Sequence, residues 1–278
     1  MAAEPNCQPS YKEKIYRAYL EFMEVAERQR RWNIFDDIPW DALDRSLNSE
    51  QKAIRVETFC AEELYVPDYT ACGLVLTRDI FGLAWFAANW GYEESRHGLA
   101  FREYLLRSGM RTPAQMEALE NTLVSKTWRL PFMTRRQMAC YGALQEAATY
   151  LAYKAQRDRA RDEKDRTLET IFFLVGRDEA AHAGFYRRIV GFEMDEDRAG
   201  AIADLAHVLG GFEMPGAGLI PEYKERLRDA GGGISPRRFM ERGLLPILRA
   251  LDIGRDEFKQ AQSEESAAVA AVANDDSY

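Results

Sequence analysis

Histidine and cysteine are scarce in this chain of 278 residues. It contains three histidines and four cysteines, and no two cysteines form a C-x-x-C pair. Scattered cysteines are typical of reduced thiols in a cytosolic protein, so we expect neither a disulfide framework nor a cysteine-based zinc site. The four cysteines are Cys7, Cys60, Cys72 and Cys140.

Long apolar runs, an apolar leader and an excess of basic residues are missing as well. No run of about 18 apolar residues occurs, so we expect no membrane span. The first ten residues, MAAEPNCQPS, contain no apolar signal core, which favours a cytoplasmic location. The formal net charge is −8, whereas nucleic-acid-binding domains are usually basic, so we expect no nucleic-acid partner.

Helical periodicity dominates the rest of the chain, and few segments alternate as strands do. The pattern predicts a single domain over 1–278, with a core over about 10–250 and a small, polar, frayed end over 256–278. Long helices need long partners to cover their apolar faces, so we expect an all-α bundle. The predicted long helical segments cover residues 11–32, 49–66 with a bend near Pro67, 70–109, 134–162 and 164–192.

Two of the three histidines follow a glutamate by three residues. Glu94 and His97 lie in WGYEESRHGLAF, and Glu179 and His182 lie in VGRDEAAHAGFY. Three residues of an α-helix turn about 300°, so each pair lies on one helix face. Two such pairs facing each other could hold a pair of iron or manganese ions, because these metals accept carboxylate oxygen and imidazole nitrogen.

A di-metal carboxylate bundle also needs one glutamate from each of two further helices. In YGALQEAATYLAY, Glu146 stands among small and aromatic neighbours, where an acid costs free energy unless it is paired or coordinated. Upstream of Glu94, the stretch VETFCAEELYVPDY offers Glu57, Glu62 and Glu63. The helix face of Glu63 is the more apolar, which favours Glu63, and the choice between it and Glu62 stays open.

The third histidine, His207, has no acid three residues before it. We therefore interpret it as a structural histidine and not as a metal ligand.

At these residues the chain resembles the soluble acyl-acyl-carrier-protein desaturases of the ferritin-like superfamily. EESRHG matches the family pattern E-E-x-R-H-G, DEAAH matches D-E-x-x-H, and QEAAT matches Q-E-x-x-T. Trp90 stands four residues before Glu94, as a tryptophan does in the family, and Trp32 precedes the connector NIFDDIP in a similar way. Glu63 lies four residues before Pro67, which matches E-x-x-x-P. The resemblance spans roughly residues 10–250.

The resemblance implies a ferritin-like four-helix bundle core with additional N- and C-terminal helices. It implies that Thr149 places a hydroxyl near the oxygen-binding side and that Asp178 holds a ligand histidine. It also implies that Trp32 and Trp90 belong to hydrogen-bonded routes towards the metals. The implied ligands of two iron ions are Glu63, Glu94, His97, Glu146, Glu179 and His182.

The implied activity is O₂-dependent introduction of a double bond into an acyl chain carried on acyl-carrier protein. No flavin or nicotinamide motif is visible, so a ferredoxin-type electron donor is implied. Carrier proteins are acidic, so a basic patch should surround the channel mouth. The candidate patches are KAQRDRARDEK, TRRQ and SPRRFMER. A homodimer is expected from the resemblance.

The chain departs from the family in EELYVPDY, which has one more residue between its glutamate pair and Pro67 than the usual form. Alignment on the glutamate pair would nominate Glu62 as the ligand. The connection before the first Glu-x-x-His pair is also shortened, which puts the shape of the substrate channel in doubt.

Other functions fit the same residues. The same centre could hydroxylate a C–H bond or oxidise an amine nitrogen in a secondary-metabolite pathway, and manganese could replace iron. An iron-storage bundle or a metal-free helical scaffold would also use long helices.

Overall fold

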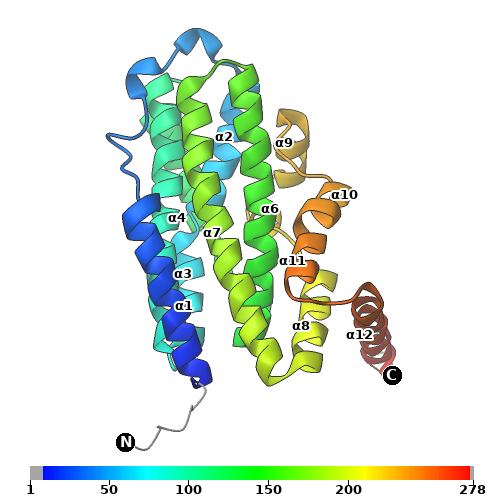
Figure 1. The fold of residues 1–278 in the computed structure, drawn as a ribbon. Coiled ribbons are helices and arrows are strands. Elements are labelled where there is room, and N and C mark those ends of the chain that lie inside the picture. Colours follow the sequence, from blue (N-terminus) through cyan, green and yellow to red (C-terminus); the bar gives the residue numbers. More distant parts are fainter. Residues whose placement is uncertain (1–8, 276–278) are drawn as a thin grey trace, which may run out of the picture.

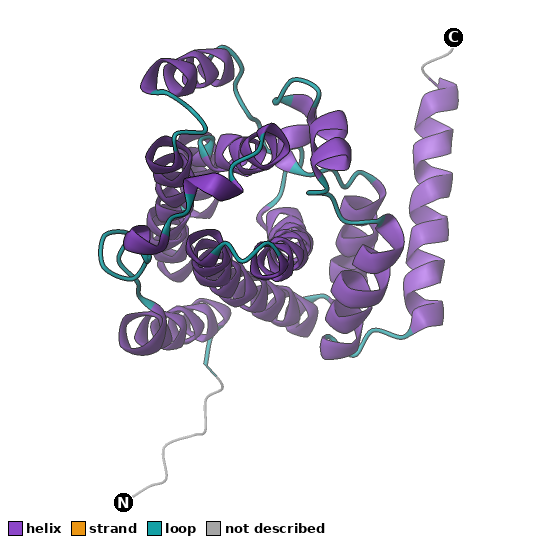
Figure 2. Ribbon diagram, turned by 90° about the horizontal axis from the view of Figure 1, so that it is seen from above, coloured by secondary structure: helices purple, strands orange, loops and turns teal. Residues whose placement is uncertain are grey.

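The computed structural model describes residues 9–275, with side chains as far as residue 267. Cys7, the rest of the first eight residues and the last three residues lie outside this range. Within it the chain is helical and contains no strand (Figures 1 and 2), so the predicted all-α class is confirmed. The helices are α1 (Tyr11–Val25), α2 (Glu50–Glu63), α3 (Val66–Thr77), α4 (Phe81–Ser108), α5 (Pro113–Val124), α6 (Arg135–Asp162), α7 (Arg166–Glu196), α8 (Arg198–Gly210), α9 (Tyr223–Ala230), α10 (Pro236–Phe239), α11 (Leu245–Ala250) and α12 (Arg255–Asp275).

Helices α2, α4, α6 and α7 form the central bundle (Figure 1). A tight turn joins α6 to α7, and Lys164 in this turn has a positive φ of 60°. Helix α1 packs on α4 and α7, α3 packs on α4, and α8 packs on α6 and α7. Helix α9 covers α2, while α12 lies against α8 at the edge of the molecule (Figure 2).

Side-chain caps and turn residues set the ends of the central helices. Ser49 accepts a hydrogen bond from the Lys52 backbone at the start of α2, and Thr134 accepts one from the Gln137 backbone at the start of α6. The predicted bend near Pro67 is present, because α2 ends at Glu63 and Pro67 lies in the first turn of α3. Gly109 ends α4 with a φ of 76°, a left-handed conformation that glycine adopts easily.

The predicted helix over residues 11–32 is not continuous. Helix α1 ends at Val25, and a π-helical turn, η1 (Ala26–Arg30), follows it. The Arg31 backbone N–H donates to the Ala26 carbonyl over 2.9 Å, which is a bond across five residues in place of four. Because the extra residue changes the direction of the side chains, Arg30 is turned into the protein interior.

The end of the chain also differs from the prediction. We expected a frayed segment over 256–278, whereas α12 continues to Asp275. Alanine and glutamate recur in this segment, and both favour helix even where little apolar surface is buried. His207 of α8 lies 2.6 Å from Glu265 Oε1 of α12, so this histidine links the two helices.

Two apolar clusters enclose a polar layer in the middle of the bundle. On α4 the layer lies between Trp90, in one cluster, and Phe101, in the other. On α7 it lies between Val175 and Tyr186, which also belong to different clusters. The predicted ligand residues occupy this layer, so they are shielded from water on both sides. The cysteines that the structure describes, Cys60, Cys72 and Cys140, are free thiols.

None of the helices in residues 9–275 combines the length and the apolar character that crossing a membrane requires.

Replacement of Gly82 by Ala should loosen the contact between α1 and α4. A Cβ atom at Gly82 would lie 2.9 Å from the Tyr16 backbone nitrogen and 3.0 Å from Ile15 Cγ2. Because backbone must shift to relieve this contact, we expect a loss of about 1–3 kcal/mol in the free energy of unfolding, measured by chemical denaturation. Gly184→Ala on α7 is the matched control, since a Cβ atom there meets nothing within 4 Å and should be neutral or stabilising. Equal effects of the two substitutions would contradict the contact.

Candidate metal centre

Six buried side chains from the four central helices converge on one point in the polar layer. Their ligand atoms form two groups of four, and within each group the atoms lie within 4.8 Å of one another. The first group is Glu63, Glu94, His97 and Glu179, and the second is Glu94, Glu146, Glu179 and His182. Glu94 and Glu179 belong to both groups. A carboxylate shared by two groups can bridge two ions, so the arrangement suits a pair of metals.

Each histidine directs one ring nitrogen at the carboxylates and the other at a different acid. Nδ1 of His97 lies 3.1 Å from Glu94 Oε2 and 3.1 Å from Glu179 Oε1. Nδ1 of His182 lies 2.9 Å from Glu94 Oε1. The two Nε2 atoms lie 3.3 Å from Asp178 and 2.7 Å from Glu93, respectively. An acid beside Nε2 favours the proton there and leaves the Nδ1 lone pair for a metal.

Although some of these distances are short, several buried polar atoms of these groups make no hydrogen bond with any described residue. They are Glu94 Oε1, Glu146 Oε2, both carboxylate oxygens of Glu179, and His182 Nδ1. Buried polar atoms normally have partners, so a cluster of lone pairs facing one point is the arrangement that a bound cation would satisfy. Four carboxylates and two imidazoles form a donor set of hard oxygen and borderline nitrogen, which fits iron or manganese.

The pKa shifts in the site also favour bound cations. Burial, followed by the charge of Glu94, raises the pKa of Glu63 and of Glu179 well above the usual range of a carboxyl group. Burial acts in the opposite direction on His97, but the charge of Glu94 and the nearby acids raise the pKa of this histidine overall. Without cations, protons must therefore offset part of the negative charge. Two divalent cations would take their place.

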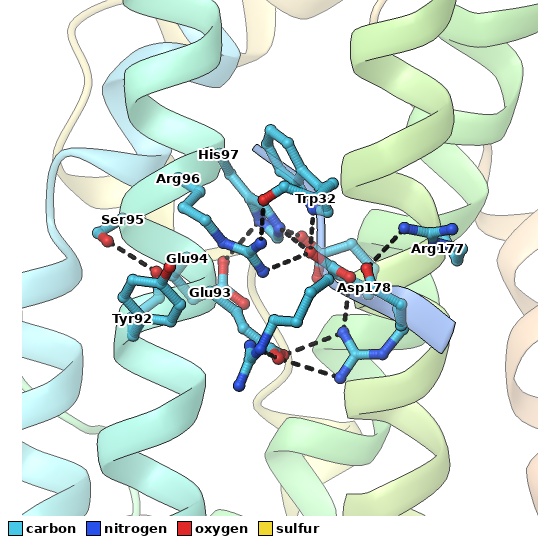
Figure 3. A network of polar contacts seen from close by, with 12 residues as sticks. Trp32, Tyr92, Glu93, Glu94, Ser95, Arg96, His97, Arg177 and Asp178 are labelled. Carbon is cyan, nitrogen blue, oxygen red and sulfur yellow. Dashed lines mark hydrogen bonds and ion pairs between the residues drawn. The ribbon is translucent and has the colours of Figure 1, made fainter. Parts of the chain in front are cut away.

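Charged and aromatic side chains surround the two histidines, and Figure 3 shows Trp32, Arg96 and Asp178 beside His97. Arg30 Nη1 donates to Asp178 Oδ1 over 2.6 Å, and Trp32 Nε1 donates to Asp178 Oδ2 over 2.7 Å. Arg30 also donates to Glu93 over 3.0 and 3.1 Å. The ring of Trp32 is nearly parallel to that of His97, with centroids 6.4 Å apart. The histidines are thus fixed in orientation before any metal binds.

Each acid beside a histidine Nε2 atom comes from the helix that carries the other histidine. Glu93 precedes Glu94 on α4 but contacts His182 of α7, whereas Asp178 precedes Glu179 on α7 but contacts His97 of α4. Burial raises the pKa of Glu93, but His182 and Arg30 outweigh it and lower the pKa to about 2. Glu93 is therefore an anion at neutral pH, as a partner of a metal-binding imidazole should be.

A sequence model of the family described as fatty acid desaturase matches residues 40–228, which contain all six converging side chains. The chain belongs to the fatty acid desaturase family.

Relatives in this family are named as desaturases of acyl chains on acyl-carrier protein. DesA1 of Mycobacterium tuberculosis, an acyl-[acyl-carrier-protein] desaturase by name, is 24% identical over 241 residues, which cover 78% of this chain and 70% of DesA1. The chloroplastic acyl-[acyl-carrier-protein] desaturase 4 of Oryza sativa subsp. japonica is 34% identical over 131 residues, 46% of this chain and 31% of that protein. The chloroplastic stearoyl-[acyl-carrier-protein] 9-desaturase of Helianthus annuus is 30% identical over 185 residues, 63% of this chain and 44% of that protein.

The fold is shared with the solved structure of a protein named as an acyl-ACP desaturase. DesA2 of Mycobacterium tuberculosis has 19% sequence identity and a TM-score of 0.62, over 91% of this chain and 99% of that chain. At this identity the likeness shows the fold alone. The predicted ferritin-like helical architecture is confirmed.

The structure places the remaining predicted residues of this desaturase-family site around the six converging side chains. Trp90 Nε1 donates to Glu146 Oε1 over 2.9 Å. Thr149 lies one turn after Glu146 and lines the cavity beside the carboxylates, where its hydroxyl donates to the Gln145 carbonyl over 3.1 Å. Glu62 is also buried but belongs to neither group of four; its carboxylate accepts a hydrogen bond from Tyr223 instead. The geometry therefore favours Glu63 over Glu62 as the ligand.

Sequence reasoning missed several residues of the site. Glu93 was overlooked although it immediately precedes Glu94, as Asp178 precedes Glu179. Arg30 carried no signal, because its position depends on the π-helical turn η1. Tyr153, two turns after Glu146 on α6, donates to Glu63 Oε1 and is fully buried. Its spacing of seven from Glu146 could have indicated this contact.

Metal affinity of this site should fall as the pH falls. Because the pKa values of Glu63 and Glu179 are raised, protons occupy these carboxylates in the metal-free protein and must leave when metal binds. At lower pH, protons compete more strongly with the metal for these carboxylates. Competition titrations with a chelator, repeated from neutral towards acid pH, should show weaker binding at each step, and calorimetry in two buffers should detect proton release. An affinity that does not change with pH would contradict this account.

Proposed function

We propose that this chain is an O₂-dependent di-iron desaturase that introduces a double bond into an acyl chain carried on acyl-carrier protein. The observation that carries the proposal is the pair of four-residue groups that share Glu94 and Glu179, in a chain of the fatty acid desaturase family. The printed names of its relatives support the substrate class.

In this proposal six side chains would hold the two metals. They are Glu63 and His97 of the first group, Glu146 and His182 of the second, and Glu94 and Glu179, which belong to both. When bound, the two irons supply the redox chemistry that breaks an unactivated C–H bond. Removal of two hydrogen atoms from adjacent carbons, with two electrons and two protons supplied from outside, balances the reduction of one O₂ to two water molecules.

The side chains of this protein position the metals and exclude water. Asp178 and Glu93 orient the two imidazoles, and Tyr153 and Trp90 each fix one terminal carboxylate by donating a hydrogen bond. The two apolar clusters keep water from the layer, which limits side reactions with solvent. We assign to Thr149 the hydroxyl that faces the small cavity where O₂ would arrive.

A second, larger cavity of about 500 Å³ offers a place for the acyl chain. It shares Glu62, Thr149 and Met214 with the small cavity beside the carboxylates. Most of the other lining side chains are apolar, as an alkyl chain requires. An acyl chain in this cavity would reach the metal centre from the side of α6 and α9.

The basic segment SPRRFMER is the best candidate for contact with the acidic carrier. Pro236 and Phe239 of this segment line the larger cavity, and Arg237, which pairs with Glu241 of the same segment, is 86% exposed. Its place beside the larger cavity distinguishes this segment from the other two. The segment TRRQ is engaged elsewhere, since Arg136 pairs with Asp197 and Asp204. In KAQRDRARDEK, several cations pair with acids of α6 itself or of the turn after it. We therefore expect the carrier protein to dock at α10. The proposal also includes a separate ferredoxin-type electron donor and a homodimer.

Product analysis tests the proposal. The iron-loaded protein is incubated with O₂, a ferredoxin, its reductase and saturated acyl-carrier proteins of several chain lengths, and the released acyl chains are examined by mass spectrometry. We expect a loss of two mass units from one or more chains. A gain of one oxygen atom would instead identify a hydroxylase, and absence of any product from an enzyme with two irons per chain would overturn the proposal.

Substitution of Glu63 and of its neighbour Glu62 by Gln separates the two candidates for the ligand. Glu63→Gln removes a carboxylate from one group of four, so we expect the metal content to fall from two ions per chain to about one. Glu62→Gln is the matched control and should keep two ions. Metal analysis by mass spectrometry after anaerobic loading gives both values, and the reverse result would assign Glu62 as the ligand.

A further inference from the structure

The larger cavity has an exposed, charged end and a buried end. Lys224 and Arg228 line it, and their side chains are 74% and 68% exposed, so they mark the mouth. Glu62 and Thr149 line this cavity and also the small cavity beside the carboxylates, so they mark the inner end. Most of the other lining side chains are apolar. They include Phe59, Ala148, Ala152, Phe212 and Phe239.

The inner end carries an acid that the metal groups do not use. Glu62 is 9% exposed, and its Oε1 atom accepts a hydrogen bond from the Tyr223 hydroxyl. Its other oxygen, Oε2, receives no hydrogen bond from any residue that the structure describes, and no described cation pairs with this carboxyl. Oε2 is not fully enclosed by protein, so it is open to the cavity that Glu62 lines. A chain that fills the cavity removes water from this oxygen, so a chain that supplies a donor there would be favoured.

Three elements hold the Glu62 carboxyl in place. Glu62 lies in the last turn of α2, Tyr223 begins α9, and Gly216 lies in the 3₁₀ turn η4 (Pro215–Gly218). A Cβ atom at Gly216 would lie 3.0 Å from Glu62 Oε1 and 2.5 Å from Tyr223 Cε2. The absence of a side chain at Gly216 therefore makes room for the Glu62–Tyr223 pair. These contacts hold the carboxyl at the cavity wall.

We propose that Glu62 determines specificity by accepting a hydrogen bond from a hydroxyl or amino group on the acyl chain. This inference rests on the proposed function, because it takes the larger cavity as the place of the acyl chain. Since Glu62 also lines the small cavity at the metal centre, the donor on the chain lies close to the carbon that is oxidised. A plain alkyl chain would leave Oε2 without a partner, so the enzyme favours a functionalised chain.

Binding measurements on the anaerobic ferrous holoenzyme test the proposal without turnover. The probes are carrier-bound saturated chains of one length: a plain chain, a series in which a hydroxyl group moves from carbon to carbon, and the corresponding amino series. We expect at least one member of a series to bind about tenfold or more tightly than the plain chain, because a buried hydrogen bond to a carboxylate is a strong one. The same preference should appear in kcat/KM.

Two variants identify the group that is recognised. Glu62→Leu should abolish the preference while leaving two irons per chain. Glu62→Gln retains an accepting oxygen but loses the charge, so it should keep a preference for a hydroxyl chain and lose one for an amino chain. Each result assigns the donor to one of the two chemical classes.

Two results would overturn the inference: a plain chain that binds wild-type protein as tightly as every functionalised chain, or a Glu62→Leu variant that weakens all probes equally. Failure of the proposed function is distinguishable from both. In that case a functionalised chain would still bind with the expected preference, but no probe would yield an unsaturated product.

Discussion

Substitution of Glu179 by Gln should remove metal from both positions at once. Glu179 belongs to both groups of four, and neither of its carboxylate oxygens has a hydrogen-bond partner among the described residues. Loss of this shared carboxylate weakens the binding of both ions, so we expect less than one iron per chain after anaerobic loading. Desaturation should fall by at least about a thousandfold, because the metals supply the chemistry.

Two comparisons separate this effect from general damage to the protein. Glu146→Gln alters only one group of four and should retain about one ion. The metal-free Glu179→Gln protein should be no less stable than metal-free wild type, since the substitution removes a buried charge that other carboxylates oppose. A Glu179→Gln protein that still holds two irons would show that Glu179 is not a bridge.

Substitution of Asp178 by Ala should damage both stability and metal binding. Asp178 is fully buried and receives hydrogen bonds from Arg30, Trp32 and Arg96. Removal of the acid leaves the buried guanidinium groups of Arg30 and Arg96 without this partner, which costs about 3–5 kcal/mol in the free energy of unfolding. His97 also loses the group that orients its ring, so metal affinity should fall by about 10–100-fold. Denaturation curves and chelator competition measure the two effects.

A matched control, Asp165, lies at one end of the bundle, where the turn after α6 leads into α7. Asp165 is also buried, pairs with Lys52 over 2.8 Å and accepts a hydrogen bond from Tyr104. Asp165→Ala should destabilise the protein by a similar amount but leave the affinity for metal unchanged. If Asp178→Ala and Asp165→Ala lower metal affinity equally, the role of Asp178 is only structural.

The parts of the site that follow helical spacing could be predicted from the sequence. Glu94 with His97, and Glu179 with His182, are fixed relative to each other by a single helix, so their common face can be calculated. The structure brings these four residues together with Glu63 and Glu146. Their role as ligands stays a prediction until metal is seen.

Other parts depend on contacts that spacing does not encode. Arg30 reaches Asp178 because η1 widens one turn between α1 and the connector, and a single extra residue in a turn leaves no periodic signal. The contact between Glu93 and His182 joins residues 89 positions apart. Tyr223 reaches Glu62 from the last third of the chain, where α9 folds over α2. Helix α12 forms although, as far as residue 267, it buries little apolar surface.

Anomalous X-ray diffraction at the iron absorption edge, on crystals of the anaerobically loaded protein, tests the central claim directly. The account predicts two iron peaks in the polar layer, both within bonding distance of Glu94 and Glu179. Each peak should also contact one histidine, His97 for one and His182 for the other. A single peak, or two peaks that do not share the two glutamates, would contradict it.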